Sequence, residues 1–245
     1  MLCAMSEPHP AVLVLVSADA EWAPVVEALR PERLERCPYG NFFVQSVGGT
    51  PILFLHGGWG KIAAAASTEY AISRWQPQVL MNLGTCGGIR GRAQRGEKLL
   101  VMRAITYDIQ ESMGSAEAAI LARTTEIDLT WLDDEFPVPV RRTHIVSGDR
   151  DLVPSEVTGL VRDFDAVAGD WESSAIAYVA ARRGVPLLII RAVSDLVDEV
   201  AGETIGALPV FKEAAAAQMR SLLADLESLI PYVLDRLRQT YASGV

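Results

Sequence analysis

Three runs of mainly apolar residues constrain the fold of this chain more strongly than any other feature. They lie at Ala11–Val16, Val79–Leu83 and Leu187–Val193. A run that does not alternate polar and apolar residues is typical of a strand covered on both faces. Segments of helical composition follow the first run at Glu21–Arg30 and precede the second at Lys61–Trp75. We therefore predict an α/β fold, with a mostly parallel sheet between two layers of helices.

The remaining segments continue this alternation. Phe42–Val47 and Pro51–His56 flank the turn GGT at 48–50, a pattern that predicts a β-hairpin. Further strands are expected at Leu99–Ile105, Thr143–Ser147 and Ala166–Ala168, and further helices at Pro154–Phe164, at Trp171–Arg183 and from Val210 to about Gln239, with an interruption at Pro231. Residues 111–142 are polar, acidic and the least regular, and are candidates for a cap or a partner contact. The absence of a repeat or a linker favours one domain over 1–245, with 1–10 as a disordered tail.

Composition excludes several classes of partner. The formal charge is −9 and the pI is near 4.9, so nucleic acid and anionic membranes would be repelled. No apolar run reaches the roughly 18 residues of a membrane span, and the first residues lack the pattern of a signal peptide. Cys3, Cys37 and Cys86 are odd in number and dispersed, which favours the cytoplasm. With neither CxxC nor HExxH present, we expect no metal, and we expect no cofactor.

Three acidic residues lie where predicted strands end, which is where open α/β sheets bind their ligands. Glu21 follows the first strand, Glu172 follows Ala166–Ala168, and Asp195 follows Leu187–Val193. The glycine loop Gly84–Gly88 ends a fourth strand. An acid at a helix N-terminus contributes about 0.3–1 kcal/mol through the dipole, so Glu21 and Glu172 each have a purely structural interpretation. Asp195 requires a partner because it follows a buried strand, and the three acids together favour a site.

Other motifs do not carry a function. HGGWGK at 56–61 lacks the first glycine and the Ser or Thr of a phosphate-binding loop, and SAD at 17–19 lacks the glycines of a dinucleotide fingerprint. Cys86 as a nucleophile, with His56 or His144 as its base, has no local support. A buried small apolar role is favoured for this cysteine.

Three segments together resemble a known family. MNLGTCGGI, AVAGDWESSAIAYVAARRGVP and LLIIRAVSDLVDE, in this order and spacing, resemble the nucleoside phosphorylase/nucleosidase superfamily, and most closely its 5′-methylthioadenosine/S-adenosylhomocysteine nucleosidases. The resemblance implies a three-layer α/β/α fold around a mixed, mostly parallel twisted sheet. It also implies cleavage of the N-ribosidic bond of a purine nucleoside, and a homodimer or higher homo-oligomer with its site near the interface.

The resemblance assigns a role to each acid. By position, Asp195 would be the general acid that protonates purine N7, Glu172 would hold the ribose hydroxyls, and Glu21 would position and deprotonate the attacking water. Cleaving a glycosidic bond builds positive charge on the sugar and negative charge on the leaving group. A proton donor at the base and a carboxylate near the sugar address these two charges. To act in this way Asp195 must hold a proton near neutral pH, which a dry strand end favours.

The resemblance also implies a substrate pocket formed by Thr85, Cys86, Gly87, Asp151, Leu152, Trp171, Glu172 and Ser194. Some of these positions depart from the family. Asp151 stands where the nucleosidases usually carry an aromatic that stacks on the base, which leaves the choice between adenine and another purine open. Trp171 replaces a methionine under the ribose, and Thr85 replaces a serine but keeps a hydroxyl. Trp59 has no clear counterpart and is expected in the core.

The turn after the first strand bears on the nucleophile. The superfamily's phosphorylases bind phosphate there with glycine and arginine, whereas this chain has SADAE, ending at Glu21. A carboxylate ~4 Å from a phosphate charge costs about 4 kcal/mol at an effective dielectric near 20, so water is the expected nucleophile. Arg191 or a residue of a neighbouring subunit would weaken this argument. A phosphate-dependent purine nucleoside phosphorylase and a non-catalytic nucleoside-binding module are the alternatives, and the trio of acids disfavours the second.

Overall fold

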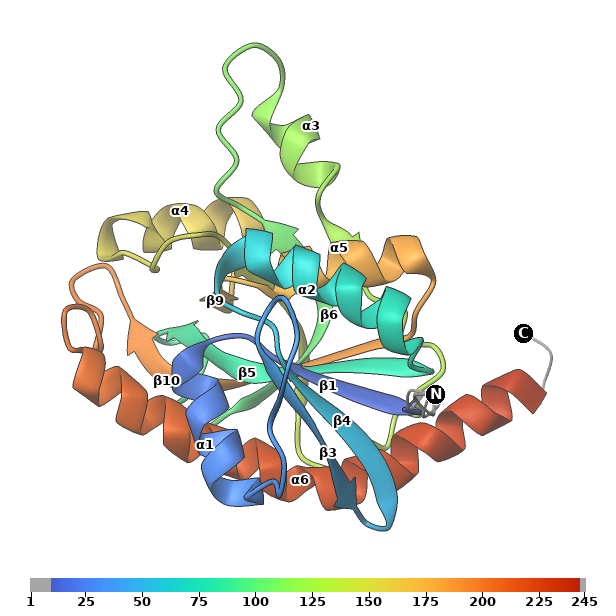
Figure 1. Cartoon of the computed structure of the whole chain (residues 1–245). Coiled ribbons are helices and arrows are strands. Elements are labelled where there is room, and N and C mark those ends of the chain that lie inside the picture. The colour runs from blue at the N-terminus through green and yellow to red at the C-terminus, as the bar shows by residue number, and fades with distance from the viewer. Residues whose placement is uncertain (1–9, 243–245) are drawn as a thin grey trace.

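A computed structural model describes residues 10–242 of the chain, and its secondary structure forms three layers. The helices α2 (Gly60–Trp75) and α5 (Ser173–Arg183) pack together on one face of a mixed sheet, with α4 (Pro154–Phe164) beside them (Figure 1). The helices α1 (Asp19–Leu29) and α6 (Leu208–Ala242) cover the other face. The predicted α/β/α architecture is confirmed.

The sheet combines parallel and antiparallel pairs. Its strands are β1 Val12–Val16, β2 Glu35–Arg36, β3 Asn41–Val47, β4 Thr50–His56, β5 Val79–Ile89, β6 Lys98–Thr106, β7 Thr125–Glu126, β8 Arg141–Ser147, β9 Ala168–Asp170 and β10 Leu187–Val197. The two longest ladders, β5 with β10 and β6 with β8, are parallel, and β1 pairs in parallel with β4 and β5. The predicted hairpin is confirmed as the antiparallel pair β3–β4.

Part of the sheet closes on itself. The strand order runs β10-β6-β8-β9-β5-β1-β4-β3-β2, and β10 also pairs with β5. The strands β5, β10, β6, β8 and β9 therefore form a closed ring, in which the second half of β5 lies between β10 and β9. The residues that follow the predicted strand Val79–Leu83 thus have a neighbouring strand on each side.

The glycine segment is the main correction to the expected fold. Gly84–Gly88 is part of β5, not a loop after it. Glycine is required here because neighbouring groups approach closely: a Cβ on Gly84 would lie 1.9 Å from Nη1 of Arg191, and one on Gly88 would lie 2.7 Å from Cγ1 of Val193. Because Gly84 and Gly88 have no side chain, β10 can pack closely against β5.

Other boundaries also differ from those expected. β10 continues to Val197 beyond an irregularity between Val193 and Asp195, so Asp195 lies inside the strand. β9 is shifted to Ala168–Asp170 because Asp170 pairs with Ser147 of β8. The helix α6 runs through Pro231 without the expected interruption, and buried residues on both sides of the proline hold it.

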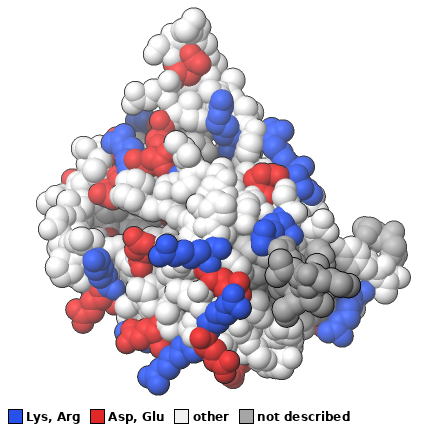
Figure 2. All heavy atoms as spheres, viewed as in Figure 1, with Lys and Arg blue, Asp and Glu red and all other residues white. Residues whose placement is uncertain are grey.

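Only the first part of the expected irregular stretch forms an arm, because Ile127, Leu129, Leu132 and Val138 of its second part are buried in the core. The short helix α3 (Ala116–Leu121) projects from the body and has no buried residue (Figure 1). Acidic and basic side chains are interspersed on the face shown in Figure 2. Of the expected tail, residues 1–9 lie outside the described residues and Pro10 is buried, so this expectation is wrong for Pro10. No helix within residues 10–242 is long and apolar enough to cross a membrane.

Candidate active site

The predicted residue Glu21 lies at the start of α1 and is 4% exposed. Because β1 runs parallel to β5, the end of β1 brings α1 beside the second half of β5. There Oε1 of Glu21 accepts hydrogen bonds from the backbone N of Thr85, at 2.5 Å, and from its Oγ1, at 2.8 Å. The structure thus joins two predicted site residues, and helix capping is a minor role of Glu21, since the amide of Ala18 lies at 3.4 Å from Oε2.

A wholly buried arginine lies beneath this carboxylate. Nε of Arg191 donates to Oδ2 of Asp170 at 2.7 Å, and Nη2 donates to Oδ1 of Asn82 at 2.7 Å. Nη1 has no hydrogen-bond partner within the described chain, and both it and Oε1 of Glu21 face the backbone of Gly84. Burial opposes the charge of Arg191, but the carboxylates of Asp170 and Glu21 outweigh it and raise the pKa of the guanidinium.

Glu172 is the second buried carboxylate of the site. It is 5% exposed, precedes the first residue of α5, and accepts a hydrogen bond from the backbone N of Gly60 at 2.9 Å. Gly60 begins α2 at a φ of +85°, a conformation that favours glycine. Burial, followed by the charges of Asp170 and Glu21, raises the pKa of Glu172 to about 8. Near neutral pH this side chain therefore holds a proton in the free protein.

This shift predicts a stability gain for Glu172→Gln that depends on pH. The pKa rises from 4.5 to about 8 on folding, so the folded protein binds the extra proton between these values and the free energy of unfolding falls as pH rises through this window. Glutamine stays neutral and keeps an acceptor for Gly60. We expect the variant to be more stable than wild type by on the order of 2 kcal/mol at pH 8.5 and by much less at pH 5. Urea unfolding at both pH values measures this, with exposed Glu199→Gln as control; an equal difference at both would contradict it.

The third acid, Asp195, belongs to β10 and lies opposite Gly87 of β5, two residues beyond Thr85. Ser194 Oγ donates to Oδ1 of Asp195 at 2.6 Å, and Thr204 Oγ1 donates to Oδ2 at 2.7 Å. A Cβ on Gly87 would lie 4.0 Å from Oδ2 of Asp195 and 3.5 Å from Cδ1 of Leu152. Three residues predicted from distant segments, Gly87, Leu152 and Asp195, are therefore neighbours.

The remaining predicted residues take different places. The Cys86 side chain is buried in the core and burial raises the pKa of its thiol well above the usual value, while its carbonyl accepts a bond from Ser194. Asp151 is exposed. The Trp171 ring packs against the Trp59 ring at a tilt of 32°, with ring centroids 4.4 Å apart. Trp59 is 62% exposed, so its expected core position is wrong.

Sequence reasoning missed several groups that build the site. Asp170 neutralises Arg191, Asn82 accepts a hydrogen bond from it, Thr204 donates to Asp195, and the Gly60 amide donates to Glu172. An arginine and an asparagine inside buried apolar strands were visible signals, because such groups require partners. The amide of Gly60 carried no such signal, since a backbone group contributes nothing to a motif.

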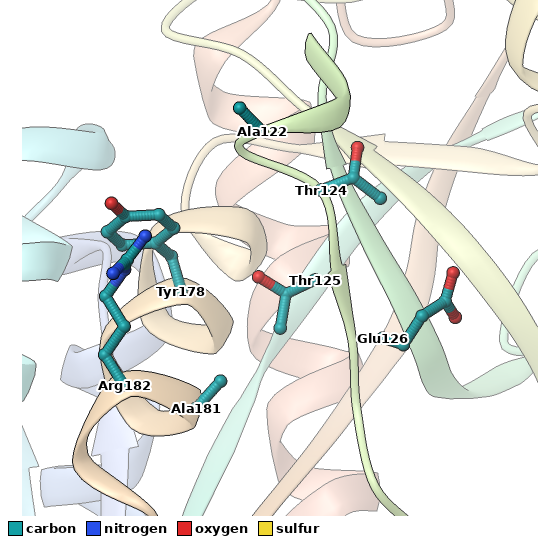
Figure 3. A pocket seen from close by; sticks show the side chains of 7 residues that line it. All are labelled: Ala122, Thr124, Thr125, Glu126, Tyr178, Ala181 and Arg182. Carbon is teal, nitrogen blue, oxygen red and sulfur yellow. The ribbon is translucent and has the colours of Figure 1, made fainter. Parts of the chain in front are cut away.

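Other parts of the described chain do not add to this site. No group of three or more His, Cys, Asp or Glu side chains in residues 10–242 is arranged to hold a metal ion. A surface pocket of about 300 Å³ between β7 and α5 is lined by Ala122, Thr124, Thr125, Glu126, Tyr178, Ala181 and Arg182 (Figure 3). None of these is a predicted site residue, and the Arg182 guanidinium packs over the Tyr178 ring at 4.3 Å.

The structure thus combines an α/β/α fold with buried acids that follow the ends of its strands. The chain belongs to the phosphorylase superfamily, whose family model matches residues 12–227. It is 26% identical over 226 residues to the 5′-methylthioadenosine/S-adenosylhomocysteine nucleosidase of Actinobacillus succinogenes, covering 87% of this chain and 98% of the relative.

Solved structures share the fold. That of the 5′-methylthioadenosine/S-adenosylhomocysteine nucleosidase of Helicobacter pylori has a TM-score of 0.71 at 19% identity, covering 90% of this chain and 100% of that one. Futalosine hydrolase of Helicobacter pylori has a TM-score of 0.70 at 19% identity, covering 89% and 98%.

Proposed function

We propose that the protein is a purine nucleosidase, which hydrolyses the N-ribosidic bond of 5′-methylthioadenosine, S-adenosylhomocysteine or a related purine nucleoside and releases the free base. Asp195 gives a proton to N7 of the base, Glu172 accepts hydrogen bonds from the ribose hydroxyls, and Glu21 positions and deprotonates water. The curated relatives, among them the nucleosidase from Actinobacillus succinogenes, support this substrate class.

The observation that carries the proposal is the segment Thr85–Gly87 of β5. Thr85 bonds Glu21, and two residues further Gly87 lies beside Asp195. Residues two apart on a strand face the same side and are ~7 Å apart. The proposed base for water and the proposed acid for the leaving group thus contact residues two apart on one strand, a spacing that suits hydrolysis of a glycosidic bond.

The charges around Glu21 favour water over phosphate. Arg191 is the buried cation nearest to Glu21, and its charge is already shared with Asp170 at 2.7 Å. A phosphate dianion beside Glu21 would add negative charge to a site that has more carboxylates than cations. A neutral water molecule meets no such repulsion, and the unpartnered Nη1 of Arg191 faces the same backbone as Glu21.

The site indicates which bond is cleaved more clearly than it indicates the base and the 5′ substituent of the nucleoside. Trp59 precedes Gly60 and Trp171 precedes Glu172 in the chain, and Gly60 and Glu172 are joined by a hydrogen bond. The two tryptophan rings, which pack against each other, therefore lie close to the proposed ribose carboxylate. Asp151, next to Leu152, is the proposed determinant of base choice. The TM-scores to the nucleosidase and to futalosine hydrolase are 0.71 and 0.70, so the fold alone does not distinguish between these two activities.

A nucleoside panel tests the proposal. We expect the protein to release base from at least one of 5′-methylthioadenosine, S-adenosylhomocysteine, adenosine and inosine at a rate that is the same with and without phosphate. The products are separated chromatographically, and the sugar is assayed as free sugar or as sugar 1-phosphate. Strict dependence on phosphate, with sugar 1-phosphate as product, would identify a phosphorylase. Comparing adenine with hypoxanthine nucleosides in the same panel tests the role of Asp151.

Assembly and location belong to the same proposal. We infer a homodimer, for which the arm with α3 is a candidate contact because Met113 is fully exposed and Leu121 is 64% exposed. Cys37 and Cys86 are free thiols, which fits a reducing cytoplasm. Sedimentation of the purified protein measures the oligomeric state.

A further inference from the structure

Each oxygen of the Asp195 carboxylate is held by a hydroxyl group. Ser194, its neighbour in β10, binds Oδ1, and Thr204 binds Oδ2 from the connection that leads to α6. Thr204 lies nine residues further along the chain. Its position therefore depends on the path of the connection at residues 198–207.

This connection folds back along the end of β10. The backbone N of Glu203 donates to the carbonyl of Leu196 at 3.1 Å, and the backbone N of Leu196 donates to Oε2 of Glu203 at 2.9 Å. With Glu203 opposite Leu196, the next residue, Thr204, comes to lie opposite Asp195. The hydroxyl of Thr204 thus reaches Asp195 because Glu203 is fixed.

Two arginines from the connection between β5 and β6 fix Glu203. Nη2 of Arg90 donates to Oε1 of Glu203 at 2.8 Å, and Nε of Arg95 donates to Oε2 at 2.7 Å. Arg90 also donates, at 2.9 Å, to Asp198, which lies with Glu203 in the connection between β10 and α6. The bonds from Arg95, Leu196 and Arg90 lower the pKa of Glu203 to about 2, so this group is a carboxylate at every pH used in an assay. We call Arg90, Arg95 and Glu203 the Glu203 clamp.

The geometry points to Thr204 as a positioning residue for Asp195, kept in place by the Glu203 clamp; the inference rests on the proposed function, in which Asp195 is the acid. When Asp195 gives its proton to the base, negative charge develops on a carboxylate that already has the Thr204 hydroxyl 2.7 Å from Oδ2. A hydrogen bond that strengthens as charge develops stabilises the transition state more than the ground state. The other titratable groups that interact with Asp195 are the Cys86 thiol of β5 and the Arg95 guanidinium.

Substitutions of Thr204 separate this role from a structural one. Thr204→Val keeps the shape but removes the donor, and we expect kcat to fall about 10- to 100-fold with little change in KM. Thr204→Ser keeps the donor and should restore kcat. A Thr204→Val protein with wild-type kcat, or one whose KM changes as much as its kcat, would overturn the inference.

A second pair of variants tests the clamp. Glu203→Gln should lower kcat by about 2- to 5-fold, since partly exposed ion pairs are individually weak, while Glu199→Gln on the same connection should leave it unchanged. Equal effects of the two would remove the clamp from the inference. Thermal unfolding of each variant shows whether a lower kcat comes from a general loss of structure. In that case the melting temperature falls together with kcat. If wild type releases no base from any nucleoside, the proposed function fails; if wild type is active and Thr204→Val matches it, only this inference fails.

Discussion

Asp195→Asn should reduce kcat for base release by about 10³-fold while the protein keeps its fold and its affinity for nucleosides. Asparagine has nearly the same shape and retains an oxygen that accepts from Ser194 or Thr204. It has no proton to give, so the purine must leave as an anion. The loss should concern the rate of the chemical step and not KM, because the missing interaction forms in the transition state.

Single-turnover rates and equilibrium binding of a nucleoside measure the two quantities separately. Asp163→Asn is the matched control, since this exposed residue on α4 pairs only with its neighbour Arg162 in the described structure. A variant at position 195 that keeps more than a third of the wild-type rate would exclude Asp195 as the acid. A wild-type protein that binds nucleosides but turns none over would identify a binding module instead.

Glu21→Gln should cost about 10²- to 10³-fold in kcat through loss of the base that activates water. The amide retains an oxygen for the Thr85 bonds, so the position of the side chain is preserved. The charge is lost, and this has a second consequence: Glu21 is one of the charges that raise the pKa of Glu172, so the pKa of Glu172 should fall towards its usual value. Arg191 loses one of its countercharges but keeps Asp170.

The pH dependence of unfolding reports this coupling. In Glu21→Gln the window over which stability falls with rising pH should end at a lower pH than in wild type. Glu27→Gln on the exposed side of the same helix is the control and should change neither the rate nor this window. An unchanged window would mean that Glu21 and Glu172 do not interact, and an unchanged rate would assign activation of water to another group.

The sequence predicted the strands better than it predicted where they end. The apolar runs located β1, β5 and β10, because burial on both faces leaves a strong local pattern. Glu21 and Asp195 followed from their places near the ends of such runs, and Glu172 from its place after the short predicted strand Ala166–Ala168. The continuation of β5 through Gly84–Gly88 was not predictable, because glycine has low strand propensity and the pairing with β9 and β10 is set by tertiary structure.

The hydrogen-bond partners of the acids could not be predicted from the sequence either. Thr204 lies in a connection without a motif, and its contact with Asp195 depends on arginines from a third segment. Trp59 was expected in the core because large aromatics usually are, whereas the turn before α2 places it at the surface beside Trp171. Local pattern thus located the acids but not the groups that tune them.

The closed ring of strands also limits how this molecule meets its neighbours. A sheet normally ends in a strand with free backbone groups, which can recruit another chain. Here the ring leaves the β3 side as one edge of the sheet, where the two-residue strand β2 pairs only with Asn41 and Phe42, so that Phe43–Val47 lack a strand partner on that side. Within residues 10–242 strand addition is therefore confined largely to this edge of β3 and to the start of β8, which pairs there with β6 alone. Copies of this chain are expected to associate through helices and the α3 arm.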